Sequence, residues 1–480
     1  MGTSCCNRPV VLERAPTTNS SKNLVMIYSK NSDLRKNYEF ISNLGSGAFG
    51  KVRLYRNKSY KDLKYAIKTL KKEGISKPLF DCLKLEVNIL RGLDHPNIVK
   101  YYEAFEDDMY LHIVMEYLQG DDLFKIISLK KVNKFNEKDM SQILRQLLKA
   151  LVFIHNKNIV HRDIKPENIL FSQKDDYSSL KLIDFGLATL TQRKDRKSCG
   201  SPYYMSPEIV NGRFCPKTDV WAAGVILYLM LAGQFPFEAD QNADIFQNIC
   251  NKKLDVSILK KNRCSPESID LVKRLLTKEL DDRPTAEEAL EHIWFVRYDN
   301  SLRHASSISM DTIETLKDFS GKSMFQKEVL FFIAKITKEE EIKKLKDIFN
   351  QMDAKNTGVL TFEEIQIAFE KVGLKIPNEE MNEIWDGLDF HKDGKINYTE
   401  FLAGMISTVM SNREEKLMSA FNYFENINEE GFITYDSLIK AMKAFDLPVN
   451  QKEIKKTFDN LSKDDKKIDY ETFKHIILGN

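Results

Sequence analysis

An octet in the first half of the chain carries side chains that could transfer a phosphoryl group to a hydroxyl. It reads His161-Arg162-Asp163-Ile164-Lys165-Pro166-Glu167-Asn168. Asp163 can accept the proton of an attacking hydroxyl, and Asn168 can bind Mg²⁺. Asp184, in Asp184-Phe185-Gly186, can take the metal that bridges the phosphates. So many fixed residue types in one short stretch predict phosphoryl-transfer chemistry here.

A glycine-rich segment upstream fits the same chemistry. In Gly45-Ser46-Gly47-Ala48-Phe49-Gly50-Lys51-Val52, three glycines let backbone N–H groups approach phosphates closely. Apolar alternation on both sides predicts a β-hairpin rather than the strand–turn–helix of a dinucleotide-binding fold. Lys68 ends an apolar strand and is either solvated or paired. Glu86, on a helical pattern, is the partner that would hold its ammonium group against phosphate oxygens.

Two segments in the second half have oxygen donors at the spacing of an EF-hand calcium loop. The stronger one has donors at positions 1, 5, 9 and 12, Gly at position 6 and an apolar residue at position 8. Its predicted Ca²⁺ ligands are Asp389, His391, Asp393, the carbonyl group of Lys395, Asn397 and Glu400. His391 replaces the usual Asp or Asn at position 3. Imidazole is a poor Ca²⁺ ligand, so this departure should lower the affinity unless water fills the position.

The weaker loop precedes it, and two more units follow. The predicted ligands of the weaker loop are Asp353, Thr357, Val359, Thr361 and Glu364. Lys355 at its position 3 opposes metal binding unless the side chain swings outward. The further loops lie near 426–437 and 461–472, where Ser437 and Thr472 at position 12 cannot supply two oxygens. We therefore expect an internal repeat of four units, the last two degenerate.

Composition bounds the elements that must position these residues. The chain has 480 residues, 42% hydrophobic and 30% charged, which is an ordinary globular balance with room for about three domains. The net charge of +2 does not indicate nucleic-acid binding, although residues 338–480 are net acidic and the rest net basic. The seven cysteines lack metal-site spacing and fit a reducing compartment. The sequence shows neither a membrane-spanning apolar stretch nor a secretory signal.

Residues 38–296 resemble the eukaryotic protein kinase family, with these motifs in the family's order. The resemblance implies a bilobal fold with a β-rich N-lobe and an α-rich C-lobe. It pairs Glu208 of Ser206-Pro207-Glu208 with Arg283, and it makes Asp219 a brace of the catalytic loop. The implied catalytic residues are Asp163, Lys165, Lys68 and Glu86, of which Lys165 is typical of serine/threonine kinases.

The resemblance also assigns the nucleotide site and the substrate side. The ATP site would combine the glycine-rich segment with Leu44, Val52, Ala66, Lys68, Met115, Glu116, Leu118, Asp122 and Leu170. Asp122 and Glu167 are acidic where related kinases bind basic substrate residues, or else they are ordinary solvated carboxylates. Ser201 matches the family's substrate-facing hydroxyl. Ser198 is the best candidate phosphosite, with Arg162 to hold the phosphate, but many related kinases need no such phosphorylation.

The remaining segments look like those of calcium-dependent protein kinases, in which a kinase is fused to a calmodulin-like domain. Residues 297–336 resemble the family's autoinhibitory junction. Residues 337–480 resemble its all-α domain of two paired helix–loop–helix lobes, which makes the whole chain an α+β multidomain protein. The N-terminal segment 1–37 reads as flexible.

The start of the chain is a candidate membrane address. Gly2 could be myristoylated, but Cys6 stands where that motif has Ser or Thr. Cys5 and Cys6 could be palmitoylated, and stable attachment takes two signals. We therefore expect a cytoplasmic protein, with or without peripheral membrane attachment.

The resemblance implies ATP, Mg²⁺, Ca²⁺ and protein substrates as ligands, and no nucleic acid. Ca²⁺ would open the EF-hand helix pairs, whose grooves would bind the junction and free the substrate cleft. Two alternatives stay open. One is an active kinase with little Ca²⁺ dependence whose EF-hand region is a docking domain, as the departures at Lys355, His391, Ser437 and Thr472 suggest. The other is a non-catalytic Ca²⁺-sensing scaffold, against which the complete set of catalytic residues argues.

Overall fold

The computed structural model describes residues 29–478 except 31–33, 48–49, 59–62, 74–76, 131–135, 192–200, 240–241, 299–307, 390, 410–412, 426–430, 445–450 and 463–466. Among these residues, no helix combines the length and the apolar character needed to cross a bilayer. Gly2, Cys5, Cys6, Ala48, Phe49 and Ser198, which the sequence singled out, lie outside the described residues.

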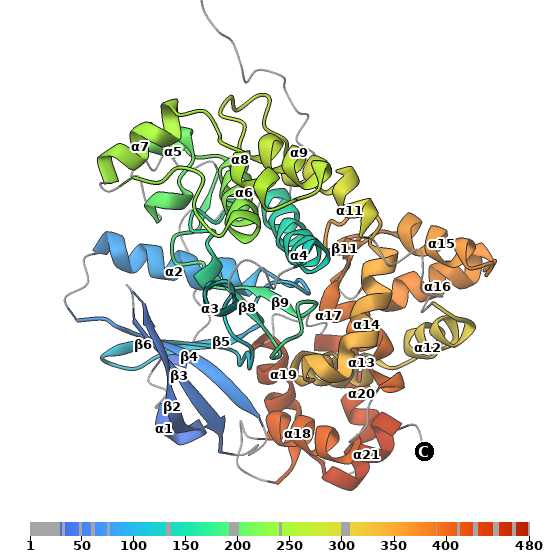
Figure 1. The fold of residues 1–480 in the computed structure, drawn as a ribbon. Coiled ribbons are helices and arrows are strands. Elements are labelled where there is room, and N and C mark those ends of the chain that lie inside the picture. Colours follow the sequence, from blue (N-terminus) through green and yellow to red (C-terminus); the bar gives the residue numbers. More distant parts are fainter. Residues whose placement is uncertain are drawn as a thin grey trace, which may run out of the picture.

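A six-stranded sheet with the spatial order β1-β5-β6-β4-β3-β2 forms the first lobe (Figure 1). Strands β2 to β6 are antiparallel, and β1 adds to the edge of β5 in parallel. Gly47 lies opposite Gly50, so the glycine-rich segment forms the predicted hairpin. The elements of this lobe are β1 (Ser29–Lys30), α1 (Leu34–Asn37), β2 (Tyr38–Gly47), β3 (Gly50–Asn57), β4 (Lys64–Lys71), α2 (Lys77–Arg91), β5 (Tyr101–Glu106) and β6 (Tyr110–Glu116).

The second lobe is helical and is built around α4 (Glu137–Asn156) and α6 (Pro216–Ala232). Helix α6 is buried around nearly its whole circumference, as expected for a helix that is apolar on every side. The other elements are α3 (Leu123–Lys130), β7 (Ile159–Val160), η2 (Pro166–Asn168), β8 (Ile169–Phe171), β9 (Leu180–Leu182), β10 (Thr189–Leu190), η3 (Pro202–Tyr204), α5 (Pro207–Val210), α7 (Asn242–Asn251), α8 (Ser257–Lys261), α9 (Pro266–Leu275), α10 (Ala286–Leu290) and α11 (Ile293–Arg297).

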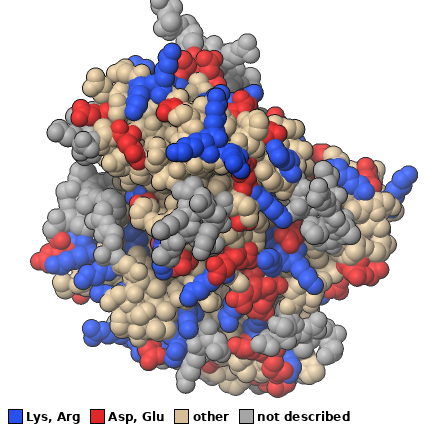
Figure 2. Space-filling view, viewed as in Figure 1, with Lys and Arg blue, Asp and Glu red and all other residues tan. Residues whose placement is uncertain are grey.

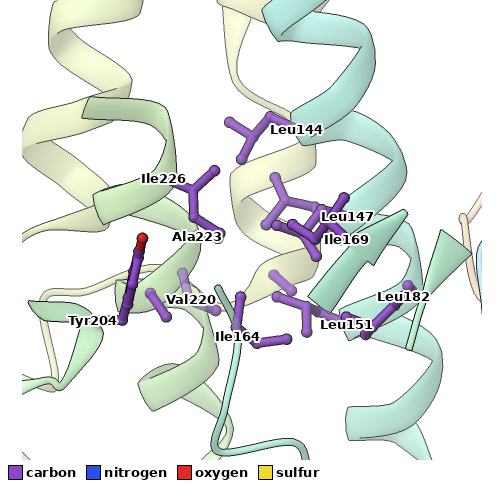
Figure 3. Close-up of a cluster of buried hydrophobic side chains, with 14 of the residues drawn as sticks. Leu144, Leu147, Leu151, Ile164, Ile169, Leu182, Tyr204, Val220, Ala223 and Ile226 are labelled. Atoms are coloured by element: carbon purple, nitrogen blue, oxygen red, sulfur yellow. The ribbon is translucent and has the colours of Figure 1, made fainter. Parts of the chain in front are cut away.

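The core between α4 and α6 also fixes the octet that carries the chemistry. Ile164, between Asp163 and Lys165, is buried and points into this core (Figure 3). It lies among Leu151 of α4 and Val220 of α6 (Figure 3). Because this side chain is anchored in apolar packing, its two polar neighbours are held at the surface of the lobe.

The remaining elements form a helical region with a core of its own, drawn in yellow to red in Figure 1. Its elements are α12 (Met310–Ser320), α13 (Met324–Ile336), α14 (Glu339–Met352), β11 (Val359–Leu360), α15 (Phe362–Lys371), α16 (Asn378–Leu388), β12 (Ile396–Asn397), α17 (Tyr398–Met405), η4 (Ile406–Thr408), α18 (Arg413–Glu425), β13 (Ile433–Thr434), α19 (Tyr435–Ala444), α20 (Gln451–Leu461), β14 (Lys467–Ile468) and α21 (Tyr470–Leu478). The short strands pair as β11 with β12 and as β13 with β14, each antiparallel. These pairings join the four helix–loop–helix units into two lobes.

The predicted junction packs within this helical region. Helix α12 packs against α16 and α17, and α13 packs against α17, α18 and α20. Phe325 and Phe332 of α13 both contact the ring of Phe424 on α18, with centroids 6.4 and 5.9 Å apart. In this conformation the described part of the junction is therefore held by the EF-hand region.

The helical region also contacts the first two lobes directly. Val359 of β11 packs against the core that the first two lobes share, and Lys343 of α14 pairs with Asp176 at 2.8 Å. Figure 2 shows Lys and Arg interspersed with Asp and Glu over the viewed face, without separate basic and acidic halves. The charge asymmetry of the sequence thus does not divide this face.

Candidate active site and calcium loops

Lys68 of β4 joins the two lobes through a pair of carboxylates. Its Nζ lies 2.6 Å from Glu86 Oε1 on α2 and 2.9 Å from Asp184 Oδ1. Burial works to lower the pKa of Lys68, but these two carboxylates outweigh it and raise the pKa. Burial likewise works to raise the pKa of Asp184, and Lys68 reverses that effect and lowers it. The structure therefore brings together three predicted residues as one charged cluster.

The octet forms a compact polar cluster around Asp163. Lys165 Nζ lies 2.7 Å from Asp163 Oδ2 and 3.3 Å from Ser201 Oγ. Ser201 Oγ donates to Asp163 Oδ1 at 3.5 Å. Asn168 Nδ2 donates to the carbonyl oxygen and Oδ2 of Asp163 at 2.8 and 3.0 Å. Because the nitrogen of Asn168 is used in this way, its side-chain oxygen is left as a donor of the kind Mg²⁺ prefers.

Asp219 at the start of α6 holds the backbone of this loop. Its Oδ2 and Oδ1 accept from the backbone N–H groups of His161 and Arg162, both at 2.9 Å. Arg162 and Asp184 have positive φ angles of 67° and 58°, which non-glycine residues adopt at a cost. The buried carboxylate of Asp219 thus stabilises a strained loop, as the resemblance implies for a brace.

The residues of the predicted ATP site come from the strands of the first lobe, the segment after β6 and β8. Ala66 pairs with Met115, and Val52 pairs with Lys68, so these residues share one part of the sheet. Leu118 is buried, whereas Leu44 is 43% exposed. Leu170 on β8 forms an isolated bridge with Asp122. A Cβ on Gly50 would lie 2.4 Å from Thr69 O, so the turn needs glycine there.

Glu208 and Arg283 form the predicted ion pair in the second lobe. Arg283 Nη1 and Nη2 donate to the two oxygens of Glu208 at 2.6 and 3.0 Å. Arg283 is fully buried and stacks over Trp221. Such a two-bond geometry fixes both side chains, and through them the segment that follows Ser201.

The stronger calcium loop has its outer carboxylates turned inward. Asp389 accepts from the N–H groups of Asp393 and Gly394 at 3.2 and 3.1 Å. Glu400 accepts from the N–H of Asn397 at 2.8 Å and contacts His391 Nδ1 at 2.5 Å. The bond to Glu400 is the main cause of a raised pKa at His391. The donor types are those that Ca²⁺ uses, but no three acidic, imidazole or thiol side chains among the described residues are gathered to hold a metal ion, and Ca²⁺ would have to take Glu400 from His391.

The weaker loop repeats this arrangement. Asp353 accepts from the N–H groups of Thr357 and Gly358, and Glu364 accepts from the N–H of Lys355. The Lys355 side chain is exposed, so the cation does not lie inside the loop. The donor types of this loop are therefore also those of a Ca²⁺ site, while its carboxylates accept from the loop's own N–H groups.

In the third unit, local hydrogen bonds are made by the residue at position 12. Ser437 Oγ accepts from Thr434 N and donates to Thr434 O, both at 2.9 Å. Ile433 pairs with Ile468 across the two loops. The strand pairing of this lobe thus forms without a chelating residue at position 12.

Sequence reasoning missed several residues that connect the kinase lobes with the EF-hand region. Lys181 of β9 is fully buried, 3.3 Å from both Glu116 and Glu339. Asp94, which follows α2, accepts from Thr399, at position 11 of the stronger calcium loop. Partners that lie this far apart in the chain produce no local sequence pattern. They meet only because the EF-hand region packs against the first two lobes.

Comparisons with known proteins agree with this architecture. A protein kinase domain model matches residues 38–295, and a model of an EF-hand domain pair matches residues 342–406. Calcium-dependent protein kinase 34 of Arabidopsis thaliana is 33% identical over 448 residues, which are 92% of this chain and 84% of that protein. Calcium-dependent protein kinase 22 of the same plant is 33% identical over 488 residues, covering 98% and 96%. Calcium-dependent protein kinase 7 of Oryza sativa subsp. japonica is 33% identical over 416 residues, covering 86% and 76%. The chain is therefore a protein kinase and belongs to the calcium-dependent protein kinase family.

Proposed function

We propose that this kinase transfers the γ-phosphate of ATP to Ser or Thr hydroxyls of protein substrates under the control of Ca²⁺. The observation that carries the proposal is the cluster of Asp163, Lys165 and Ser201 beside the Lys68 ion pairs. The described junction helices pack within the EF-hand region.

Each polar group of the cluster has a task in that reaction. Asp163 would orient the substrate hydroxyl and accept its proton, while Lys165 would stabilise negative charge beside it. Lys68, held between Glu86 and Asp184, would position the phosphates. Asn168 and Asp184 would hold Mg²⁺, which neutralises phosphate charge when it is bound.

Two carboxylates support a preference for basic substrates. Glu167 is an exposed member of the octet, and Asp122 lies at the start of α3, where it accepts from Lys125 N at 2.8 Å. A basic substrate residue close to either carboxylate would find a partner of opposite charge.

The proposed control by Ca²⁺ rests on the two loops whose donor types suit the ion. Ca²⁺ would be held by the predicted ligands of the stronger loop and, more weakly, by those of the loop starting at Asp353. A ligand shifts a conformational equilibrium only by its differential affinity for the two states. His391 already contacts the Glu400 carboxylate, so Ca²⁺ binding would have to break this contact. The net free energy of Ca²⁺ binding that is available to move the junction would therefore be smaller than in a loop with Asp at position 3.

The test is peptide phosphorylation by the full chain, titrated from chelator to millimolar Ca²⁺, with Asp163→Asn as the blank. We expect activity that rises with Ca²⁺ and loses this rise in Glu400→Gln. Glu383→Gln, which removes an exposed charge on α16, is the matched control and should respond like the wild type.

The other outcomes separate the alternatives. Equal activity in chelator would leave a kinase whose EF-hand region serves another purpose. No activity above the blank in any condition, with ATP still bound, would favour a non-catalytic scaffold.

A further inference from the structure

The segment that follows α2 contacts both calcium loops of the first EF-hand lobe. This docking segment, residues 92–98, links the helix that carries Glu86 to the next strand of the kinase sheet. Within it, Asp94 faces the stronger loop and His95 faces the weaker one. The kinase domain therefore contacts both calcium loops through two adjacent residues.

Asp94 makes a two-bond contact with the first turn of α17. Its Oδ2 accepts from the backbone N–H of Thr399 at 2.8 Å, and its Oδ1 accepts from Thr399 Oγ1 at 2.9 Å. Thr399 is buried, with 5% of its surface exposed. The N–H groups of a helix's first turn have no partner inside the helix, so a carboxylate there both satisfies a donor and complements the helix dipole.

The residue after Thr399 is Glu400, the predicted position-12 ligand. Asn397 caps the same turn, with its side chain accepting from Glu400 N at 2.9 Å. The first turn of α17 is thus held from the loop side by Asn397 and from the kinase side by Asp94. A carboxylate that fixes this turn fixes the backbone from which Glu400 reaches into the loop.

The neighbouring contact with the weaker loop is steric rather than charged. A Cβ on Gly358 would lie 2.4 Å from His95 Cδ2 and 2.8 Å from Phe153 Cδ2. Gly358 has a φ of +74° and lies at position 6 of its loop. The weaker loop therefore packs closely against the kinase domain at this point. The Asp94 contact with the stronger loop belongs to the same interface.

We propose that Asp94 of the kinase domain is a positioning residue for calcium in the stronger loop. It holds the turn that carries Glu400 and adds a negative charge next to the cation site. This inference rests on the proposed function, in which that loop binds Ca²⁺. Because coupling between two binding events is reciprocal, calcium in this loop also tightens docking of the EF-hand lobe on the segment after α2.

The experiment is isothermal titration of the full chain with CaCl₂, comparing the wild type with Asp94→Asn. The amide can still accept from Thr399, so this variant removes mainly the charge. We expect Ca²⁺ affinity of the stronger loop to fall about three- to tenfold, as for a lost charge near a bound cation. Asp176→Asn, which removes an interdomain carboxylate that pairs with Lys343, is the matched control and should stay within twofold.

Two further variants separate this inference from the proposed function. Glu400→Gln should remove the stronger binding event; if it leaves the isotherm unchanged, the loop does not bind Ca²⁺ and both ideas are overturned. If Glu400→Gln removes binding but Asp94→Asn keeps wild-type affinity, only the role of Asp94 is overturned.

Thermal unfolding in chelator tests a purely structural role. A lower melting temperature of Asp94→Asn with unchanged Ca²⁺ affinity would overturn the proposal. Should Asp94→Asn fail to fold, Thr399→Val removes one of the two bonds while keeping the Asp94 charge. Thr399→Val should lower the Ca²⁺ affinity by less than the three- to tenfold expected for Asp94→Asn. Wild-type affinity in Thr399→Val would count against positioning through this turn.

Discussion

Replacing Glu339 with Gln would remove the carboxylate that completes a buried charge cluster between the kinase and the EF-hand region. Glu339 begins α14 and lies 3.3 Å from Lys181 Nζ and 2.8 Å from Lys346 Nζ. Lys181 is fully buried and has Glu116, at the end of β6, as its other carboxylate. Burial works to raise the pKa of Glu339, but the two lysines outweigh it and lower the pKa, so the carboxylate stays charged at neutral pH.

The magnitude follows from the burial of Lys181. Removing one partner of a buried ion pair costs about 3–5 kcal/mol, because the remaining charge is left uncompensated. Lys181 keeps Glu116, and the Glu339 side chain is 11% exposed, so the low end of this range applies. At about 2–4 °C per kcal/mol for a domain of this size, a loss of about 3 kcal/mol lowers the melting temperature by about 6–12 °C.

The assay is thermal unfolding of the full chain in chelator, with Glu340→Gln as the control. Glu340 is the next residue and is exposed, so its variant should shift the transition by less than about 1 °C. Adding Lys181→Met to Glu339→Gln should recover part of the loss, since removing both charges leaves less buried charge unpaired. A Glu339→Gln transition indistinguishable from that of Glu340→Gln, or a double variant less stable than the single one, would refute the reasoning.

Three other expectations follow from single contacts. Glu328 of α13 is buried and has no hydrogen-bond partner among the residues that the structure describes, and burial raises its pKa well above the usual value. Its contribution to stability is therefore fully present below about pH 4.3 and falls as the pH rises toward the folded-state pKa, so Glu328→Gln should flatten the dependence of the melting temperature on pH between about 5 and 8. Glu208→Gln should cost about 3–5 kcal/mol because it leaves buried Arg283 without a carboxylate, and an unchanged unfolding transition would contradict this. Gly358→Ala should loosen the weaker loop from His95, which would appear as faster hydrogen exchange in the segment after α2 and unaltered exchange in α6.

The active-site residues show how far a local pattern reaches. The octet predicted a polar cluster, and its members meet because they are close in sequence and Ile164 anchors them in the core. The calcium loops are also local, since twelve residues hold every donor and the turn glycine. The roles assigned to these residues stay predictions until the experiments above are done.

Two longer-range partners were predicted. Lys68 met Glu86, which the helical pattern after the lysine suggested, and Glu208 met Arg283, as the family resemblance implied. The direction of the Lys355 side chain, by contrast, was open in the sequence and was settled by the fold, which exposes it.

The sequence by itself indicated the kinase lobes through the family resemblance of its motifs, and it indicated the helix–loop–helix repeat through the spacing of donors and apolar residues. Only the tertiary structure decided how the EF-hand region sits against the kinase. Lys181 lies between two apolar residues of a strand, where alternation predicts a solvated lysine, yet the start of α14 covers it with Glu339. Likewise, no local sequence pattern predicts that Asp94 pairs with Thr399. Their pairing depends on docking, whose free energy is summed over many weak contacts across the interface and cannot be assigned to any short stretch of the chain.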